Sequence, residues 1–190
     1  PLAALGFTVA VAAPLEAKLH EGSGTITIHR EGLSKPVVTQ NAAADHRPYL
    51  HPIIGPDGKG AFTEYSPGHH KHQTGIYLGY TRVNGRDYFH NTAVDYWKRK
   101  AVNVLEAKGE FVKWETVYDL LDADGNAVLT ETQRWSMTSE NDRHVLNLEW
   151  HGNGQTDVTI GKYPYGGLFV RMPWKKGIKG EAVNAARDSN

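Results

Sequence analysis

The chain has 190 residues, of which 21 are Lys or Arg and 21 are Asp or Glu, so its formal net charge is zero. A balanced charge argues against nonspecific nucleic-acid binding, which depends on an excess of basic residues. Cysteine is absent, which excludes disulfides, thiolate catalysis and cysteine-ligated metal sites. The residues are 39% hydrophobic and 22% charged, as in a folded domain. No apolar stretch reaches the roughly 20 residues that a membrane-spanning helix needs.

The first 13 residues are mostly apolar and end in small side chains. Ala10 and Ala12 fit the small-x-small pattern of a signal-peptide cleavage site. We therefore expect residues 1–13 to be the remnant of a secretory signal peptide, and the protein to be periplasmic or secreted. The alternative is a buried first strand or helix. Residues 14–190 are expected to form the folded part.

From Gly24 onward, apolar and polar residues alternate with period two, which is typical of half-buried β-strands. The expected strands are 25–28, 36–39, 49–54, 75–83, 86–90, 101–107, 110–121, 128–137, 143–151, 158–160 and 167–172. Asn84-Gly85 predicts a two-residue hairpin turn between two of them. No helix, βαβ unit or repeat is expected, and the tail from Lys175 reads as a loop or frayed end. The pattern predicts an all-β fold, an antiparallel β-sandwich.

The densest chemical motif is the histidine-rich segment 68–75. Its sequence is Gly-His-His-Lys-His-Gln-Thr-Gly. In an extended segment His70 and His72 project to the same side, so together they are candidates for metal ligands or for acid–base catalysis. The alternative is a set of surface histidines without a role.

A second motif lies in segment 45–52, just before and within an expected strand. Alternation places Arg47, Tyr49 and His51 on one face and directs Leu50 to the core. Prolines in the segment weaken backbone pairing, which predicts an edge or bulged strand. The alternative is that this face is simply exposed.

The third motif is segment 162–173, which contains a Gly-Gly pair between aromatic residues. By alternation one face carries Tyr163, Tyr165, Phe169 and Arg171, and the opposite face carries Leu168, Val170 and Met172. Aromatic rings beside an arginine suit a sugar, because its C–H faces stack on rings and its hydroxyls accept hydrogen bonds. An aromatic cross-strand ladder is the equally simple alternative.

Other reaction classes have less support. The sequence has no Gly-x-Ser-x-Gly elbow, no phosphate-binding glycine loop before a helix and no His-Glu-x-x-His motif. A carboxylate pair for glycoside hydrolysis cannot be assigned. The candidate carboxylates are Glu64, Asp87, Asp95 and Glu149.

Several segments, taken in order, resemble the PmoA family, whose members carry a "methane oxygenase PmoA" label. The resemblance covers the chain from about Gly24 to Pro173. It rests on Arg-Pro-Tyr-Leu-His-Pro at 47–52, Pro-Asp-Gly at 56–58, His-His-Lys-His-Gln-Thr-Gly-Ile-Tyr at 69–77, Val-Asn-Gly-Arg-Asp at 83–87 and Tyr-Gly-Gly-Leu-Phe-Val-Arg-Met-Pro at 165–173.

This resemblance implies a β-supersandwich like that of galactose mutarotase, often exported by bacteria that degrade carbohydrate. Family members are longer and continue after the Gly-Gly-Leu-Phe segment, so it implies that residues 14–190 are the N-terminal part of a longer domain, incomplete at the C-terminus. Relatives often have a histidine at the position of Gln73. The methane label is an inherited name, because the membrane monooxygenase subunit has many spanning helices and this chain has no spanning segment.

The leading hypothesis is an exported protein that binds or processes a carbohydrate, a free sugar or a glycan, with proton transfer on the sugar. His70 and His72 are the expected acid–base residues, since an imidazole pKa lies near neutral pH. The expected substrate-binding residues, which donate hydrogen bonds or offer stacking surfaces, are Arg47, Tyr49, His51, Tyr77, Tyr165, Phe169 and Arg171. We expect both histidines to line one pocket with Arg47 and Arg171.

Two other classes stay open. One is a metal-dependent enzyme that uses His70, His72 and a further ligand such as His51 or His90. The other is a noncatalytic glycan-binding or structural module. The sequence assigns no cofactor.

Overall fold

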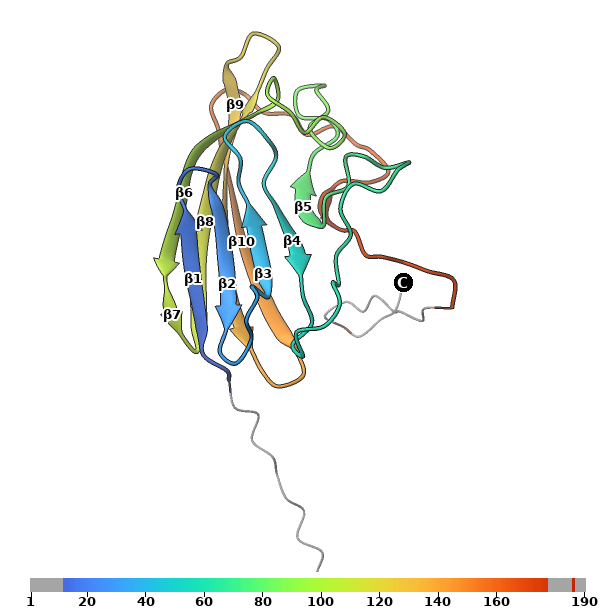
Figure 1. The fold of residues 1–190 in the computed structure, drawn as a ribbon. Helices are drawn as coiled ribbons and strands as arrows, with labels where there is room; N and C mark the ends of the chain where they lie inside the picture. The colour runs from blue at the N-terminus through green and yellow to red at the C-terminus, as the bar shows by residue number, and fades with distance from the viewer. Residues whose placement is uncertain (1–11, 178–185, 187–190) are drawn as a thin grey trace, which may run out of the picture.

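The computed structural model describes residues 12–177 and 186, and these residues form an all-β structure without helices (Figure 1). The strands are β1 (Leu15–His20), β2 (Thr25–Arg30), β3 (Val38–Asn41), β4 (Tyr49–Ile53), β5 (Ile76–Gly79), β6 (Trp97–Glu106), β7 (Lys108–Gly109), β8 (Phe111–Leu121), β9 (Ala127–Ser139), β10 (His144–Gly154) and β11 (Gly167–Val170).

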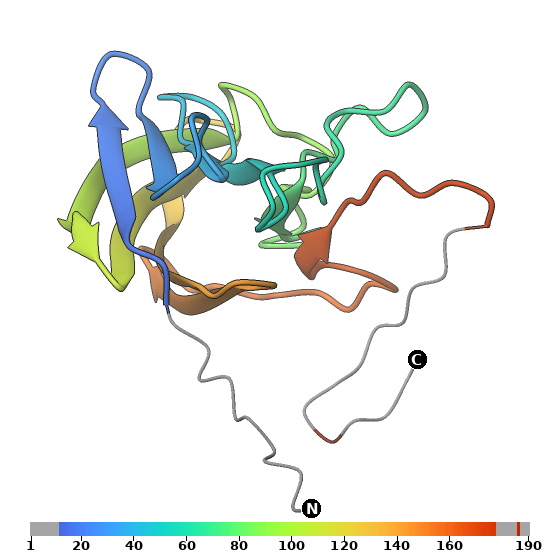
Figure 2. The ribbon, with the colours of Figure 1, turned by 60° about the horizontal axis from the view of Figure 1, so that its bottom comes forward.

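The strands form two antiparallel sheets packed face to face (Figure 2). The larger sheet has seven strands in the order β11-β5-β4-β3-β2-β1-β7, and the smaller has four in the order β10-β9-β8-β6. The predicted antiparallel β-sandwich is therefore confirmed. The longest ladders join β8, β9 and β10, where the pairing of β9 with β10 runs without a bulge from His144 opposite Ser139 to Gly154 opposite Leu129.

The core lies between the sheets because alternate side chains of each strand point inward. Ile26, Ile28 and Leu50 of the large sheet pack against Trp114 and Trp135 of the small sheet, and all five are buried. Burial of two tryptophans requires partners for their indole N–H groups. Both rings find them in buried glutamines: Trp114 Nε1 donates to Gln40 Oε1 (3.1 Å) and Trp135 Nε1 to Gln133 Oε1 (3.2 Å).

Three sequence expectations about strands were wrong. The expected strand 158–160 forms only an isolated bridge between Ile160 and Val83. Residues 15–20 form β1, although strand formation was expected only from residue 25. The expected hairpin of 75–83 with 86–90 is confined to the residues next to its turn: Asn84 and Gly85 have positive φ angles of 50° and 79°, Val83 pairs with Arg86, and the Tyr88 N–H donates to Tyr80 O (2.7 Å). Beyond the turn, the Asp87 carboxylate accepts the backbone N–H of Phe89 and folds the chain into a loop.

The apolar face of segment 167–172 does not pack in the core, contrary to expectation. Residues directly opposite each other in an antiparallel pair share a face. Val170 lies opposite Ile76, which lies opposite the buried Leu50, so Val170 points to the inner side of the large sheet. Nevertheless Leu168, Val170 and Met172 are 55%, 48% and 47% exposed. The small sheet has three strands fewer than the large one and leaves this end uncovered (Figure 2).

Among the described residues, no helix is long and apolar enough to span a bilayer. The predicted signal segment falls mostly on residues 1–11, and most of the predicted tail on residues 178–190. Apart from residue 186, these lie outside the described residues.

Candidate functional site

The histidine-rich segment lies on the outer face of the large sheet, at its β5–β11 end. Strand alternation sets this position: Tyr77 of β5 and Phe169 of β11 are paired and point away from the small sheet. Their rings stack with centroids 5.3 Å apart. The loop between β4 and β5 and the loop after β5 fold over these rings.

These loops and β11 enclose a pocket of about 220 Å³. Its wall combines imidazole, amide, phenol and phenyl groups, from His70, His72, Gln73, Phe89, His90, Tyr165 and Phe169. The structure thus brings four of the predicted site residues together: both expected acid–base histidines, one tyrosine and one phenylalanine. We call this cavity the histidine pocket.

A chain of hydrogen bonds runs from a carboxylate to the rim of the histidine pocket. The Nδ1 atom of His90 lies 2.7 Å from Asp87 Oδ2, and its Nε2 atom lies 3.2 Å from the Tyr165 hydroxyl. Because an ionised carboxylate only accepts, Nδ1 carries the proton, and in the neutral ring Nε2 then accepts a hydrogen bond from Tyr165. The arrangement fixes the tautomer of His90.

The Asp87 carboxylate is held in its charged form. Burial alone would raise its pKa, but the hydrogen bonds donated by the backbone and ring of His90 and by the backbone of Phe89 outweigh it, and the pKa lies below its ordinary value. Oδ1 accepts the two backbone N–H groups at 2.9 and 3.0 Å. The same loop geometry therefore both orients the histidine and keeps a negative charge behind it.

His72 is a neutral imidazole at physiological pH. Burial, together with the nearby His90 and the Arg47 guanidinium, lowers its pKa to about 4. Its ring centroid is 4.6 Å from that of His90 and 5.9 Å from that of His70. Two imidazoles therefore face one pocket in different electrostatic surroundings: His90 contacts the Asp87 carboxylate, and His72 lies near the Arg47 guanidinium.

Arg47 lies beneath the histidine pocket and does not line it, so its expected contact with substrate is not what the structure shows. Its side chain is fully buried and donates to the backbone oxygens of Phe89 (2.6 Å) and His72. Its guanidinium also sits 3.6 Å from the centroid of the Tyr77 ring. Alternation predicted its face correctly, but a loop covers that face. Tyr77, expected to stack on substrate, is buried with it.

Arg171 is also outside the pocket wall, although it touches a residue of that wall. It donates from Nε to Glu64 Oε2 (2.7 Å) and from Nη1 to Gln73 Oε1 (3.1 Å). The bond to Gln73 fixes the side-chain amide of a pocket residue. The expectation that Arg47 and Arg171 share the pocket with the histidines is therefore wrong in detail, and both arginines instead hold the pocket's loops in place.

Tyr49 and His51 lie on the outer face, as predicted, but apart from the histidine pocket. Both rings pack on Tyr65, each with centroids 5.6 Å apart, and His51 Nδ1 lies 2.9 Å from the Thr63 hydroxyl. They support the loop that carries the histidines. Nothing in the pocket wall comes from these two residues.

Sequence reasoning missed most of the loop after β5. Phe89 and His90 were predicted in a strand, His90 was considered only as a metal ligand, and Asp87 only as a candidate carboxylate for glycoside hydrolysis. The available signal was the spacing Asp-x-x-His, since an aspartate side chain that accepts the N–H groups two and three residues later forms a turn and meets the histidine there.

The metal alternative finds no preformed ligand set in residues 12–177 and 186. No three His, Asp or Glu side chains there converge closely enough to hold an ion. His51 is in the Tyr65 cluster, and the Nδ1 atom of His90 is taken by Asp87.

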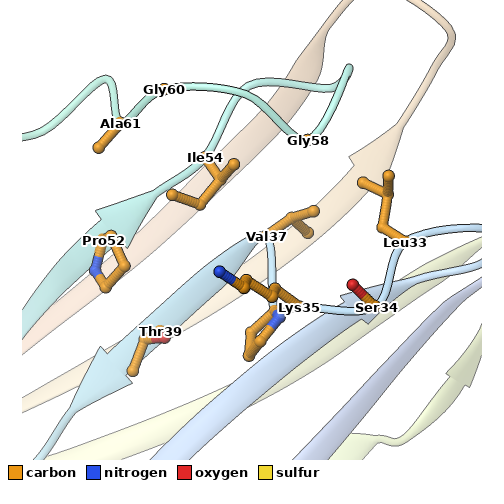
Figure 3. Close-up of a pocket in the computed structure, with 11 residues that line it drawn as sticks. Leu33, Ser34, Lys35, Val37, Thr39, Pro52, Ile54, Gly58, Gly60 and Ala61 are labelled. Carbon is orange, nitrogen blue, oxygen red and sulfur yellow. The ribbon is translucent and has the colours of Figure 1, made fainter.

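A larger cavity of about 560 Å³ lies elsewhere, over β3 and β4 (Figure 3). Its wall is mostly aliphatic, with Leu33, Val37 and Ile54 around it, and its polar side chains are Ser34, Lys35 and Thr39. It contains no histidine and no carboxylate. By size alone this larger cavity would be the first candidate for a binding site. The imidazoles that can transfer a proton line the smaller histidine pocket, however, and we take that pocket as the candidate site.

Comparison with known proteins gives one match. The family DUF6807, described as a family of unknown function, matches residues 25–190. The chain belongs to this family. No curated protein and no solved structure matches the chain. The DUF6807 match covers β2 to β11 and therefore the whole histidine pocket, and the family description assigns no activity to it.

Proposed function

We propose that this DUF6807 protein binds a sugar in the histidine pocket and transfers a proton on it. The observation that carries the proposal is the Asp87–His90–Tyr165 hydrogen-bond chain, which ends at a pocket walled by aromatic rings. The sequence resemblance to the mutarotase-like PmoA family points to the same substrate class.

The aromatic wall suits a sugar ring. The buried Phe89 ring is centred 5.2 Å from Tyr165 and 5.6 Å from Phe169 and supports these two rings from behind. Tyr165 is 46% exposed and offers both its ring and its hydroxyl. Sugars combine apolar C–H faces with hydroxyls, and such a wall with a few polar groups matches both.

The two imidazoles divide the chemistry between them. His90, backed by the Asp87 carboxylate, is the base: it gains a proton while the carboxylate stabilises the resulting imidazolium. His72 is neutral, and its ring N–H donates a hydrogen bond to the sugar oxygen on which negative charge develops. Because Nε2 of His90 accepts from the Tyr165 hydroxyl, the sugar proton passes to the Tyr165 oxygen as the phenol proton moves to His90 Nε2. The reverse transfer along the same two groups then returns a proton to the sugar, at its ring oxygen or its carbon.

The test combines binding with proton transfer. Aldoses, both neutral and acidic, are incubated with the protein in D₂O, and NMR follows anomer interconversion and deuterium entry at carbon. We expect one class of sugar to bind and react with the wild type. His90→Gln should retain binding within about threefold and lower the rate by about 10²–10⁴-fold, the usual contribution of a general base.

His151→Gln is the matched control, because His151 lies exposed on β10 in the other sheet. It should leave both binding and rate unchanged. Saturable binding without any proton transfer would replace the catalytic proposal by the glycan-binding module. Absence of binding to every sugar would refute the proposal.

Export is a separate proposal, supported by the composition of residues 1–13 alone. In a bacterial host that secretes the protein, we expect the mature N-terminus to lie after Ala12. Sequencing that N-terminus measures this directly. A product that still begins near Leu2 would contradict it.

A further inference from the structure

The histidine pocket is rich in charged and titratable groups, and not all of the charged groups form ion pairs. The charged side chains in the loops that form the pocket and directly behind it are Arg47, Glu64, Asp87 and Arg171 among others. Two carboxylates are paired: Asp87 with His90 and Glu64 with Arg171, each at 2.7 Å. Asp87 and the buried Glu131 act on the charge of Arg47 through space, but neither forms an ion pair with it.

Arg47 is a buried cation without an anionic partner among the described residues. Its Nη atoms donate to neutral oxygens of Phe89, His72 and Thr74, and its buried Nε has no hydrogen-bond acceptor. Burial lowers its pKa only to about 10, so it stays charged at neutral pH. A buried charge is costly unless it is paired. The backbone oxygens that it binds belong to two residues of the pocket wall, so its field reaches the pocket.

Several polar groups of the histidine pocket are available to donate a hydrogen bond to a ligand. The Gln73 oxygen is taken by Arg171, which leaves the amide NH₂ for a ligand. The Nδ1 atom of His70 is buried, has no partner, and carries the ring proton in one of the two neutral tautomers. Together with the N–H of neutral His72, these donors match oxygen atoms that only accept hydrogen bonds, as those of a carboxylate do.

We propose that the ligand of the histidine pocket is an acidic sugar, a uronic acid or uronate-containing glycan, whose carboxylate lies toward His72 and Gln73 in the field of Arg47. This inference rests on the proposed sugar-binding function and adds the charge of the ligand. The carboxylate supplies an anionic partner for Arg47, and the sugar ring lies against the rings of Tyr165 and Phe169.

The experiment compares ligands that differ only in charge, on the wild-type chain. Isothermal titration calorimetry measures glucuronate and galacturonate, their methyl esters, the neutral sugars glucose and galactose, and acetate. Each uronate should bind at least about tenfold more tightly than its ester, a factor that corresponds to roughly 1.4 kcal/mol. Acetate should bind much more weakly than either uronate, because it has no ring to stack.

Each other outcome has a distinct meaning. Equal affinity for acid and ester overturns the charge inference but leaves sugar binding intact. Acetate that binds as tightly as the uronates overturns both, since the site would then be a simple anion site. Binding of no ligand also refutes the proposed function itself.

A second readout is independent of affinity. NMR titration of the His72 ring should show its pKa rise when a uronate binds and not when the ester binds, because a nearby negative charge favours the protonated ring. Arg47→Gln should abolish the preference for the acid, and Arg47→Lys should retain it. If Arg47→Gln fails to fold, the comparison of acid with ester on the wild type still decides.

Discussion

Replacing Arg47 by methionine should lower the free energy of unfolding by about 3 kcal/mol, among the larger effects of a single substitution. The guanidinium joins two loops, because it donates to the carbonyl oxygen of His72 in one and of Phe89 in the other. Methionine fills much of the volume but leaves these buried acceptors unpaired, at about 1–3 kcal/mol each. Removal of a buried charge offsets part of this loss.

Urea unfolding followed by tryptophan fluorescence measures this effect. Arg82→Met is the matched control, because Arg82 is exposed and lies 5.1 Å from the Tyr163 ring. We expect the control to change stability by less than about 0.5 kcal/mol, as most surface substitutions do. Equal stability of Arg47→Met and the wild type would contradict the role of Arg47 as the residue that joins the loops.

The second large effect is on catalysis. Asp87→Asn should lower the rate of proton transfer by about 10²–10³-fold, because an amide does not stabilise the imidazolium of His90 and can stabilise the wrong tautomer. Asp87 is a positioning residue, since it touches His90 and not the pocket. KM should change by less than about threefold, because the pocket wall keeps its groups.

The folded fraction separates this role from a structural one. Asp87→Asn should lose rate while its folded fraction, measured by circular dichroism, stays that of the wild type. Asp124→Asn, in the exposed turn before β9, is the control and should leave both the rate and the folded fraction unchanged. A loss of folded protein large enough to account for the loss of rate would show that Asp87 only maintains the loop.

Strand alternation was enough to predict the fold class, because two faces of different polarity leave a period-two pattern in most strands. Alternation did not predict β1. The apolar residues Leu15, Ala17 and Leu19 of this strand follow directly on residues 1–13, which were expected to be a signal peptide and were left out of the fold prediction. Alternation also predicted an inward face for Val170 correctly but not its exposure. Exposure depends on how many strands the facing sheet has, and a single strand's sequence does not contain that number.

The candidate site was predicted only in part, because local sequence does not show which distant segments cover a residue. The histidine cluster stands out in the sequence, and His70 and His72 both line one pocket, as predicted. The segment is not extended, however: it forms turns, with the His70 N–H bonded to Pro67 O and the Gln73 N–H to His70 O. The alternation of side chains could not show that a loop would bury Arg47, since a polar residue on the outer face of a sheet is normally exposed to water. The contact of His90 with Tyr165 joins residues 75 positions apart, and no local pattern predicts such a contact.

The most direct test of the account is an NMR titration of the protein labelled with ¹⁵N in its histidine rings. Sugars of both classes, neutral and uronate, are added, and the ring signals of all ten histidines are followed. The account predicts saturable shifts of the His70, His72 and His90 signals with at least one sugar, while those of His20 and His151 stay in place. Sugar-dependent shifts confined to histidines outside the pocket, or no shift with any sugar, would contradict it.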